Sequence, residues 1–68
     1  MAPTLLTPVE VAEALRTPVA TLRHWRDKRT GPMHVKIGKR IMYREQDVLT
    51  WLDEQAEKTA EQRKAAAR

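Results

Sequence analysis

Cysteine, phenylalanine and serine are all absent from the 68 residues, and glycine occurs only twice. Without cysteine, neither a disulfide nor a cysteine-based zinc site can stabilise the fold. His24 and His34 have no matched carboxylate, and two ligands are too few for a metal centre. The closely spaced carboxylates lie mostly on the outer face of the last predicted helix, so neither a metal-dependent nor a nucleophilic enzyme is expected. We predict no cofactor and no metal.

Long apolar runs are also missing. Leu5 and Leu6 form the only apolar pair near the start and are soon followed by Pro8 and Glu10, which is unlike a signal peptide. No stretch approaches the length needed to span a bilayer. We therefore expect an intracellular, cytoplasmic protein. A chain this short predicts one small domain over residues 1–68, with a core that is local and well packed or completed by a partner.

Acidic residues are almost absent from the middle of the chain. Residues 16–44 contain nine basic residues and one acid, Asp27, for a net charge of +8. Residues 45–61 reverse the sign, with six acids against Lys58, so the overall charge of +4 hides the division. A basic middle indicates one cationic surface, as in nucleic-acid-binding proteins. An anionic membrane would attract the same charges, but no segment has the large apolar face that such binding needs.

The stretch that best fits nucleic-acid binding is a predicted helix over residues 17–29, with Thr17 as N-cap and Pro18 as first helical residue. Apolar side chains and one arginine stem share a face that we expect to be buried. These residues are Val19, Leu22, Trp25 and Arg29. The opposite face is polar, mostly basic and short-stemmed, which suits the floor of a DNA major groove. Judged from this helix alone, the alternative is that its polar face contacts only solvent and not DNA.

The residues of this helix that we predict to contact DNA lie on or beside its polar face. They are Ala20, Thr21, Arg23, His24, Asp27 and Lys28. Arg23 can reach a phosphate or a guanine edge, and Thr21 and His24 can donate to a phosphate or a base. Asp27 either accepts from a cytosine amino group or holds Arg23 in a fixed orientation, and we favour the second. Arg26, nearer the buried side, is expected either to pair with an acid of the first or last helix or to be structural.

A first helix is predicted over residues 8–15 by a capping box in which Thr7 is the N-cap and Glu10 the third helical residue. Residues 1–5 before it should form a loose arm. Only residues 16–17 separate this helix from the next. Such a short connection forces a steep crossing, so a helix-turn-helix is expected rather than a plain α-hairpin, which usually has a longer loop.

A β-hairpin is predicted after the second helix. Residues 30–32, Thr-Gly-Pro, should end that helix near residue 29. In residues 33–43, Val35 and Ile37 alternate with Lys36, and Ile41 and Tyr43 alternate with Met42. The Gly-Lys pair between them suits a type II′ turn. The tip is basic, and we predict that it contacts a minor groove or its flanking phosphates. The predicted contact residues are Lys36, Lys39 and Arg40. A solvated turn is the alternative.

The last helix is predicted to begin near Glu45. Its inner face would present Val48, Trp51, Leu52 and Gln55. Trp25 and Trp51 are expected to be the two large core anchors. The apolar stripe then ends, so the compact core should span about residues 5–56, with residues 57–68 as a helical extension or a frayed tail.

The predicted order is helix, tight turn, helix, basic hairpin and helix, which describes a mainly α winged helix-turn-helix with a small β-hairpin. Four stretches in this order resemble the small MerR-type winged helix-turn-helix proteins, a group that includes phage excisionases, or recombination directionality factors. These stretches are residues 6–12, 21–26, 35–43 and 47–52. The resemblance covers roughly residues 5–55, and its pieces are specific in combination. With no further domain, an excisionase is expected rather than a full MerR regulator, which carries a long dimerisation helix and an effector module.

The resemblance implies a sequence-specific DNA-binding and DNA-bending protein that directs a phage integrase towards prophage excision. Its partners would be double-stranded DNA of the attachment-site region, the integrase and neighbouring copies of itself along DNA, in the cytoplasm of a bacterial host. A small phage or prophage transcriptional regulator of the same fold is the alternative. A protein-interaction adaptor that uses the charged last helix is a third possibility.

The sequence departs from this family pattern at three positions. The inter-helix turn reads Arg16-Thr17-Pro18 where glycine, an apolar residue and serine are often found. Ala20 stands where some excisionases have an acid, so a carboxylate does not read a base there. Arg44 stands where an Asp or Ser cap is common, so a less firmly capped last helix is expected.

Overall fold

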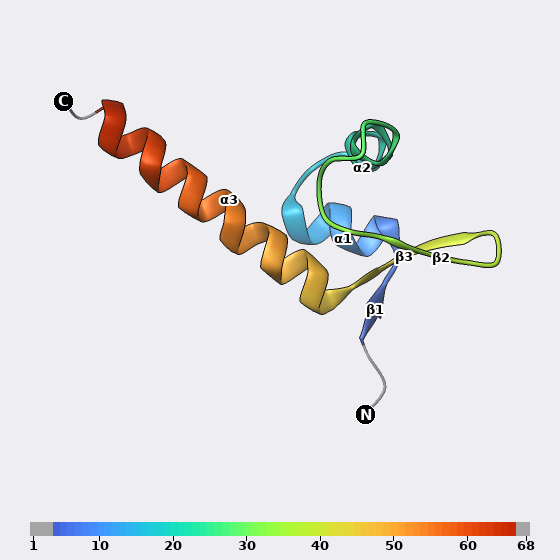
Figure 1. Ribbon diagram of the computed structural model, residues 1–68. Helices are drawn as coiled ribbons and strands as arrows, with labels where there is room; N and C mark the ends of the chain where they lie inside the picture. The colour runs from blue at the N-terminus through green and yellow to red at the C-terminus, as the bar shows by residue number, and fades with distance from the viewer. Residues whose placement is uncertain (1–3, 67–68) are drawn as a thin grey trace.

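The computed structural model describes residues 4–66, with side chains through residue 63, as three helices and a three-stranded antiparallel sheet (Figure 1). The elements in chain order are β1 (Leu5–Leu6), α1 (Pro8–Leu15), α2 (Val19–Asp27), β2 (Val35–Ile37), β3 (Arg40–Arg44) and α3 (Glu45–Ala66). This confirms the mainly α, winged helix-turn-helix fold class. Over residues 4–66, no helix combines the length and apolarity needed to cross a membrane.

The predicted capping box opens α1. The hydroxyl of Thr7 accepts from the backbone N–H of Glu10 at 3.1 Å, and the Glu10 carboxylate accepts from the backbone N–H of Thr7 at 2.9 Å. Pro8 is the first helical residue, where its missing N–H leaves no bond unmade. These local contacts fix the start of α1 at the predicted residue.

The connection between α1 and α2 corrects the predicted cap of α2. Arg16 adopts a left-handed backbone conformation, with φ of 54°, and its N–H donates to Glu13 O. The N–H of Thr17 donates to Ala12 O at 2.9 Å, which completes a Schellman motif. The Thr17 backbone is therefore part of the end of α1, and α2 does not begin until Val19, so Thr17 is not the N-cap residue. Pro18 is the N-cap residue instead, and the Thr17 hydroxyl is buried with no hydrogen-bond partner in the described chain.

A second Schellman motif ends α2 at Asp27, two residues before the predicted end. Arg29 has a φ of 56°, and its N–H donates to Arg26 O at 3.1 Å. The N–H of Thr30 donates to Trp25 O at 2.8 Å. This left-handed residue turns the chain away from the helix axis. The stem of Arg29 consequently does not lie on the buried face, and the residue is exposed.

The sheet includes a strand where the sequence predicted a loose arm. Leu5 pairs with Arg44 and Leu6 with Tyr43, so β1 covers the edge of β3 that β2 leaves open. The backbone N–H of Glu45 also donates to Thr4 O at 2.9 Å. Residues 1–3 of the predicted arm lie outside the described residues.

The predicted hairpin is confirmed, with β2 and β3 joined through Gly38 and Lys39. Gly38 has a φ of 61° at the first turn position, as a type II′ turn requires. Lys36 pairs with Ile41, and Ile37 pairs with Arg40. Cross-strand partners share a face, so Lys36 lies on the face of the sheet that carries Ile41, and Ile37 lies on the other face.

The core is small and lies where α1, α2, β3 and the start of α3 meet. Its buried residues are Val11, Ala12, Leu22, Tyr43 and Val48. Trp25 and Trp51, the two predicted core anchors, are half-buried, and Trp25 packs against the buried cluster. Their rings pack on each other at the margin of the core, with centroids 5.2 Å apart. A domain of this size buries a smaller fraction of its surface than a larger one.

Helix α3 begins at Glu45 as predicted and runs away from the other elements towards the C-terminus (Figure 1). Residues 56–63 are all exposed, and the helix continues to Ala66, so the described part of the predicted tail is a helical extension. The start of α3 is better held than predicted. The Arg44 guanidinium donates to both carboxylate oxygens of Asp47, at 2.6 and 3.1 Å, in the first turn.

Candidate nucleic-acid interface

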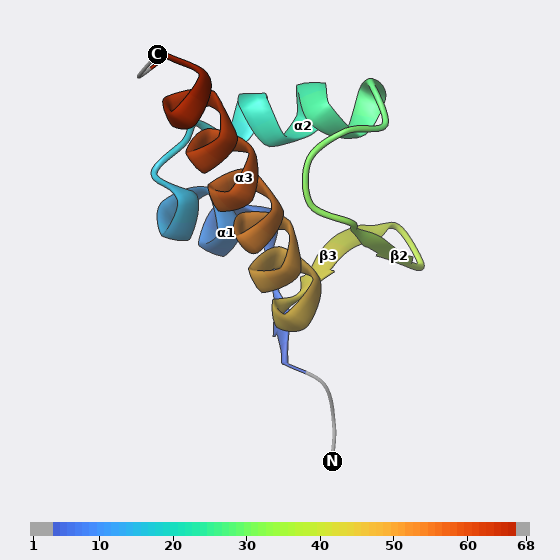
Figure 2. The same cartoon turned by 60° about the vertical axis from the view of Figure 1, so that its left-hand side comes forward.

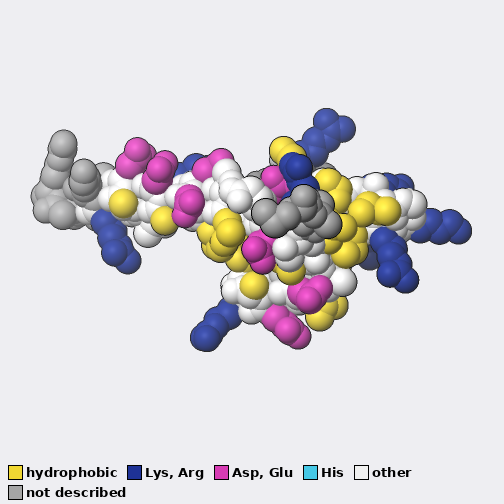
Figure 3. Space-filling view, turned by 90° about the horizontal axis from the view of Figure 1, so that it is seen from below, with side chains coloured by type: hydrophobic (Ala, Val, Ile, Leu, Met, Phe, Trp, Pro, Cys, Tyr) yellow, Lys and Arg dark blue, Asp and Glu magenta, His cyan; other side chains and the backbone are white. Residues whose placement is uncertain are grey.

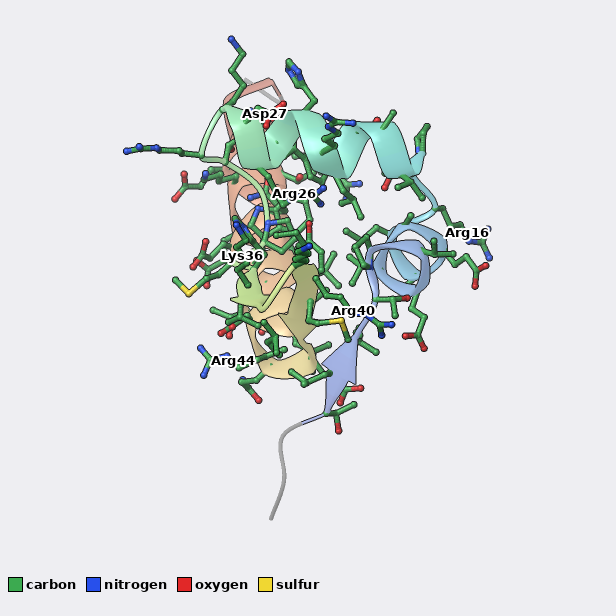
Figure 4. All side chains as sticks on the ribbon, turned by 90° about the vertical axis from the view of Figure 1, so that its right-hand side faces the viewer. Arg16, Arg26, Asp27, Lys36, Arg40 and Arg44 are labelled. Atoms are coloured by element: carbon green, nitrogen blue, oxygen red, sulfur yellow. The ribbon has the colours of Figure 1, made fainter. Side chains whose placement is uncertain are left out.

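Helix α2 and the β2–β3 hairpin lie on the part of the fold away from the extended end of α3 (Figure 1). Figures 2 and 4 both show the hairpin below α2, joined to it by the loop that leaves the C-terminal end of the helix. Lys and Arg side chains project from the hairpin end of the molecule, whereas Asp and Glu side chains lie over α3 and the central body (Figure 3). A few Lys and Arg side chains also project from α3 and the central body in this view, so the charge division of the sequence is only partly a division in space.

The polar face predicted for α2 is open to solvent. Five of its six predicted contact residues are exposed, and Thr21 is half-buried. The exposed ones are Ala20, Arg23, His24, Asp27 and Lys28. Lys28 follows the last helical residue and is the C-cap rather than part of the helix. On the inner face Leu22 is buried, but Val19 is 42% exposed because the first turn of α2 extends past the core, which corrects its predicted burial.

Asp27 does not hold Arg23 in place. Within the described residues the one ion pair joins Arg44 to Asp47, and none joins Arg23 to Asp27. The order of the charges explains this, because an acid four residues after a base opposes the helix dipole and gives the weaker of the two pairings. The Arg23 guanidinium therefore projects from α2 without this intrahelical partner.

Of the two alternatives predicted for Arg26, the structural role holds, because its partner is a buried hydroxyl and not an acid. Its Nη1 donates to the hydroxyl of Tyr43 at 2.8 Å, and Arg26 is half-buried. Tyr43 is 1% exposed and lies in β3, so this bond ties α2 to the sheet. It also satisfies a buried phenol that would otherwise lose its hydrogen bond to water.

The three predicted wing residues are exposed but do not share one face. Lys36 lies on the Ile41 face of the hairpin, Arg40 lies on the Ile37 face, and Lys39 is in the turn. Figure 4 shows Lys36 and Arg40 on different sides of the hairpin. A groove that receives the hairpin tip would therefore meet positive charge on both sides.

An open cavity of about 290 Å³ lies between the C-terminal end of α2 and the loop that leads to β2. Its lining includes Arg26, Arg29, Thr30, Gly31, Pro32 and His34. Figure 4 places Arg26 in this region, below α2 and above Lys36. None of these residues was predicted from the sequence to form a site. The one local signal for them was the Thr-Gly-Pro sequence that ends α2. A helix that ends in a Schellman motif has a left-handed residue just after its last turn, and the side chain of that residue points away from the helix.

The described part of the chain has no group of three or more His, Asp and Glu residues placed to hold a metal ion. The arrangement consists instead of donors and cations on a helix and a hairpin. Such groups recognise phosphates and base edges.

Residues 5–56 match the helix-turn-helix domain family. The match begins at β1, includes α1, α2 and the hairpin, and ends in α3 where the side chains become fully exposed. The chain matches no curated protein and no solved structure. The family suggests DNA binding without catalysis. Because the match covers well over half of its residues, this chain belongs to the helix-turn-helix domain family.

Proposed function

We propose that this protein is a sequence-specific double-stranded DNA-binding protein in which α2 enters the major groove and the hairpin contacts the adjacent minor groove. The observation that carries this proposal is the exposed, acid-poor face of α2 beside a basic hairpin. An α-helix fits the major groove, and basic side chains suit the minor groove and its flanking phosphates.

The proposed contacts follow from side-chain length and position. On α2, Arg23 would read a guanine edge or hold a phosphate, and Thr21 and His24 would donate to phosphates or bases. Ala20 and Asp27 line the same face, and Lys28 would hold a phosphate at the end of the helix. On the hairpin, the proposed contacts are Lys36, Lys39 and Arg40.

We further infer that the protein acts as an excisionase, bending DNA near a phage attachment site and directing the integrase towards excision. The four stretches that resemble MerR-type excisionases support this role. The small size of α2 and the hairpin also supports this role. Together they can contact only a short DNA site, so the protein would need partners to bind with high affinity. Residues 56–63 offer an exposed helical surface for the integrase or a neighbouring copy.

The test combines binding with recombination. A DNA site is first selected from a random library, and the protein is then footprinted on the attachment region with and without integrase. We expect a protected, bent site next to the integrase sites and excision only when the protein is present. A protein that binds this site and represses a nearby promoter, yet leaves excision unchanged, would be a transcriptional regulator instead.

Deleting residues 58–68 should remove the proposed partner-binding surface and leave the DNA-binding domain intact. Because residues 58–63 are exposed, we expect the melting temperature and single-site affinity to stay close to those of the full chain. Excision or cooperative binding should fall. A large drop in melting temperature would place this segment in the folded core. Full excision by the shortened protein would leave it without a partner role.

Replacing Lys39 and Arg40 together with alanine should lower affinity for all DNA sequences alike. Each lost phosphate contact should reduce the slope of log affinity against log salt by roughly one. The matched control is Lys58→Ala with Arg63→Ala, which removes the same charge from exposed positions on α3. Equal slopes for the hairpin variant and the wild type would mean that the hairpin faces solvent.

A further inference from the structure

We propose that the cavity between α2 and β2 seats one phosphate of the DNA backbone, with Arg26 and Arg29 as its ligands. This inference rests on the proposed function. When a helix occupies the major groove and a hairpin the neighbouring minor groove, the sugar-phosphate strand between the grooves must cross the surface that separates them. The cavity lies on that surface, since its lining runs from the last turn of α2 to the residues before β2.

The lining fits a sugar-phosphate unit. Pro32 is buried and Gly31 is half-buried, so they form an apolar floor against which a deoxyribose can rest. Arg29, Thr30 and His34 are exposed at the rim. The lining contains no acid. Guanidinium groups bind phosphate through paired N–H donors, which makes this rim suited to a backbone phosphate.

A hydrogen bond within the protein orients the Arg26 side chain for such a ligand. The bond from its Nη1 to the Tyr43 hydroxyl uses one N–H of the five that a guanidinium carries. Because Tyr43 is fixed in the core, the Arg26 side chain is oriented before any ligand arrives. Tyr43 is therefore a positioning residue, and Arg26 is the inner ligand.

Arg29 is the outer ligand, and its backbone is strained. Its φ of 56° lies in the left-handed region, where glycine is favoured and other L-residues pay a conformational cost. Glycine would form the same Schellman motif without that cost, but it would leave the rim of the cavity without a guanidinium. Strain at a residue that lines a cavity points to a role for its side chain.

The test is Arg29→Gly, which removes the strain and the charge together. We expect a melting temperature equal to or above that of the wild type. Affinity for a short duplex of random sequence should nevertheless fall about five- to tenfold, with the salt slope reduced by about one. Arg29→Gln, which keeps a side chain of similar length, should show the same loss of affinity.

Two control variants separate backbone, charge and position. Arg16→Gly makes the same change at a φ of 54° outside the cavity and should raise the melting temperature in the same way. Arg63→Gln removes one charge from α3 and should leave the salt slope unchanged. A loss of slope in Arg63→Gln equal to that in Arg29→Gln would overturn the proposal, because net charge alone would then explain it.

The direct contact is tested on a duplex carrying the selected site, in which single phosphates are replaced by uncharged methylphosphonates. We expect one position where replacement weakens the wild type but has no further effect on Arg29→Gly. If the wild type binds DNA and Arg29→Gly has the same affinity and the same salt slope, the phosphate seat is overturned but the proposed function is not. Wild-type protein that binds no DNA would overturn the proposed function itself.

Discussion

Leu22→Ala is expected to remove most of the protein's stability at room temperature, through a loss of about 2–5 kcal/mol of folding free energy. Leu22 is 1% exposed and is one of only five buried core residues. Leu→Ala removes the isopropyl group and leaves a cavity that the surrounding helices and strand refill only in part. Domains of this size are at the low end of the ~5–15 kcal/mol range of unfolding free energy, so the loss is a large part of the total.

Thermal and urea melts followed by circular dichroism measure this loss. The matched control is Leu49→Ala, the same change at a leucine of α3 that is 48% exposed, which should cost well under half as much. Similar melts for the two variants would mean that Leu22 does not lie at the centre of the core.

Arg23→Ala is expected to weaken binding to the selected DNA site by about 1–3 kcal/mol, or roughly five- to 150-fold. Arg23 is exposed on the proposed recognition face, and no ion pair with Asp27 restrains it. A guanidinium that reads a guanine edge contributes discrimination between bases. The loss should therefore be larger for the selected site than for random DNA.

Binding isotherms on both DNAs, at one salt concentration, measure this difference. Arg63→Ala removes the same side chain from α3 and should leave specificity unchanged. An equal loss on both DNAs would assign Arg23 to a phosphate rather than a base. No loss on either would exclude the outer face of α2 as the reading surface.

The sequence predicted those features of the fold that depend on neighbouring residues. The capping box of Thr7 and Glu10, the hairpin turn at Gly38 and the start of α3 all follow from local chemistry. The same is true of the exposed face of α2, because helical periodicity decides which side chains share a face.

The features that were missed depend on distant parts of the chain. Leu5 becomes a strand residue only because β3 offers an open edge, and Arg26 finds its partner in Tyr43, seventeen residues away. The predicted cap of α2 was wrong for a related reason, because the backbone N–H of Thr17 donates to Ala12 O at the end of α1. The cavity was missed because its lining is assembled from a helix end and a loop whose path depends on two left-handed turns.

The paired tryptophans give the protein a built-in optical signal. Trp25 and Trp51 are the only tryptophans, one on α2 and one on α3, and their rings are 5.2 Å apart and tilted by 45°. Two indoles this close couple their electronic transitions, which adds an ultraviolet dichroism band that helix content alone does not produce. That band reports whether the proposed reading helix is seated on the long helix. Its persistence on adding DNA would show, without any label, that α2 keeps its position on α3 when the protein binds.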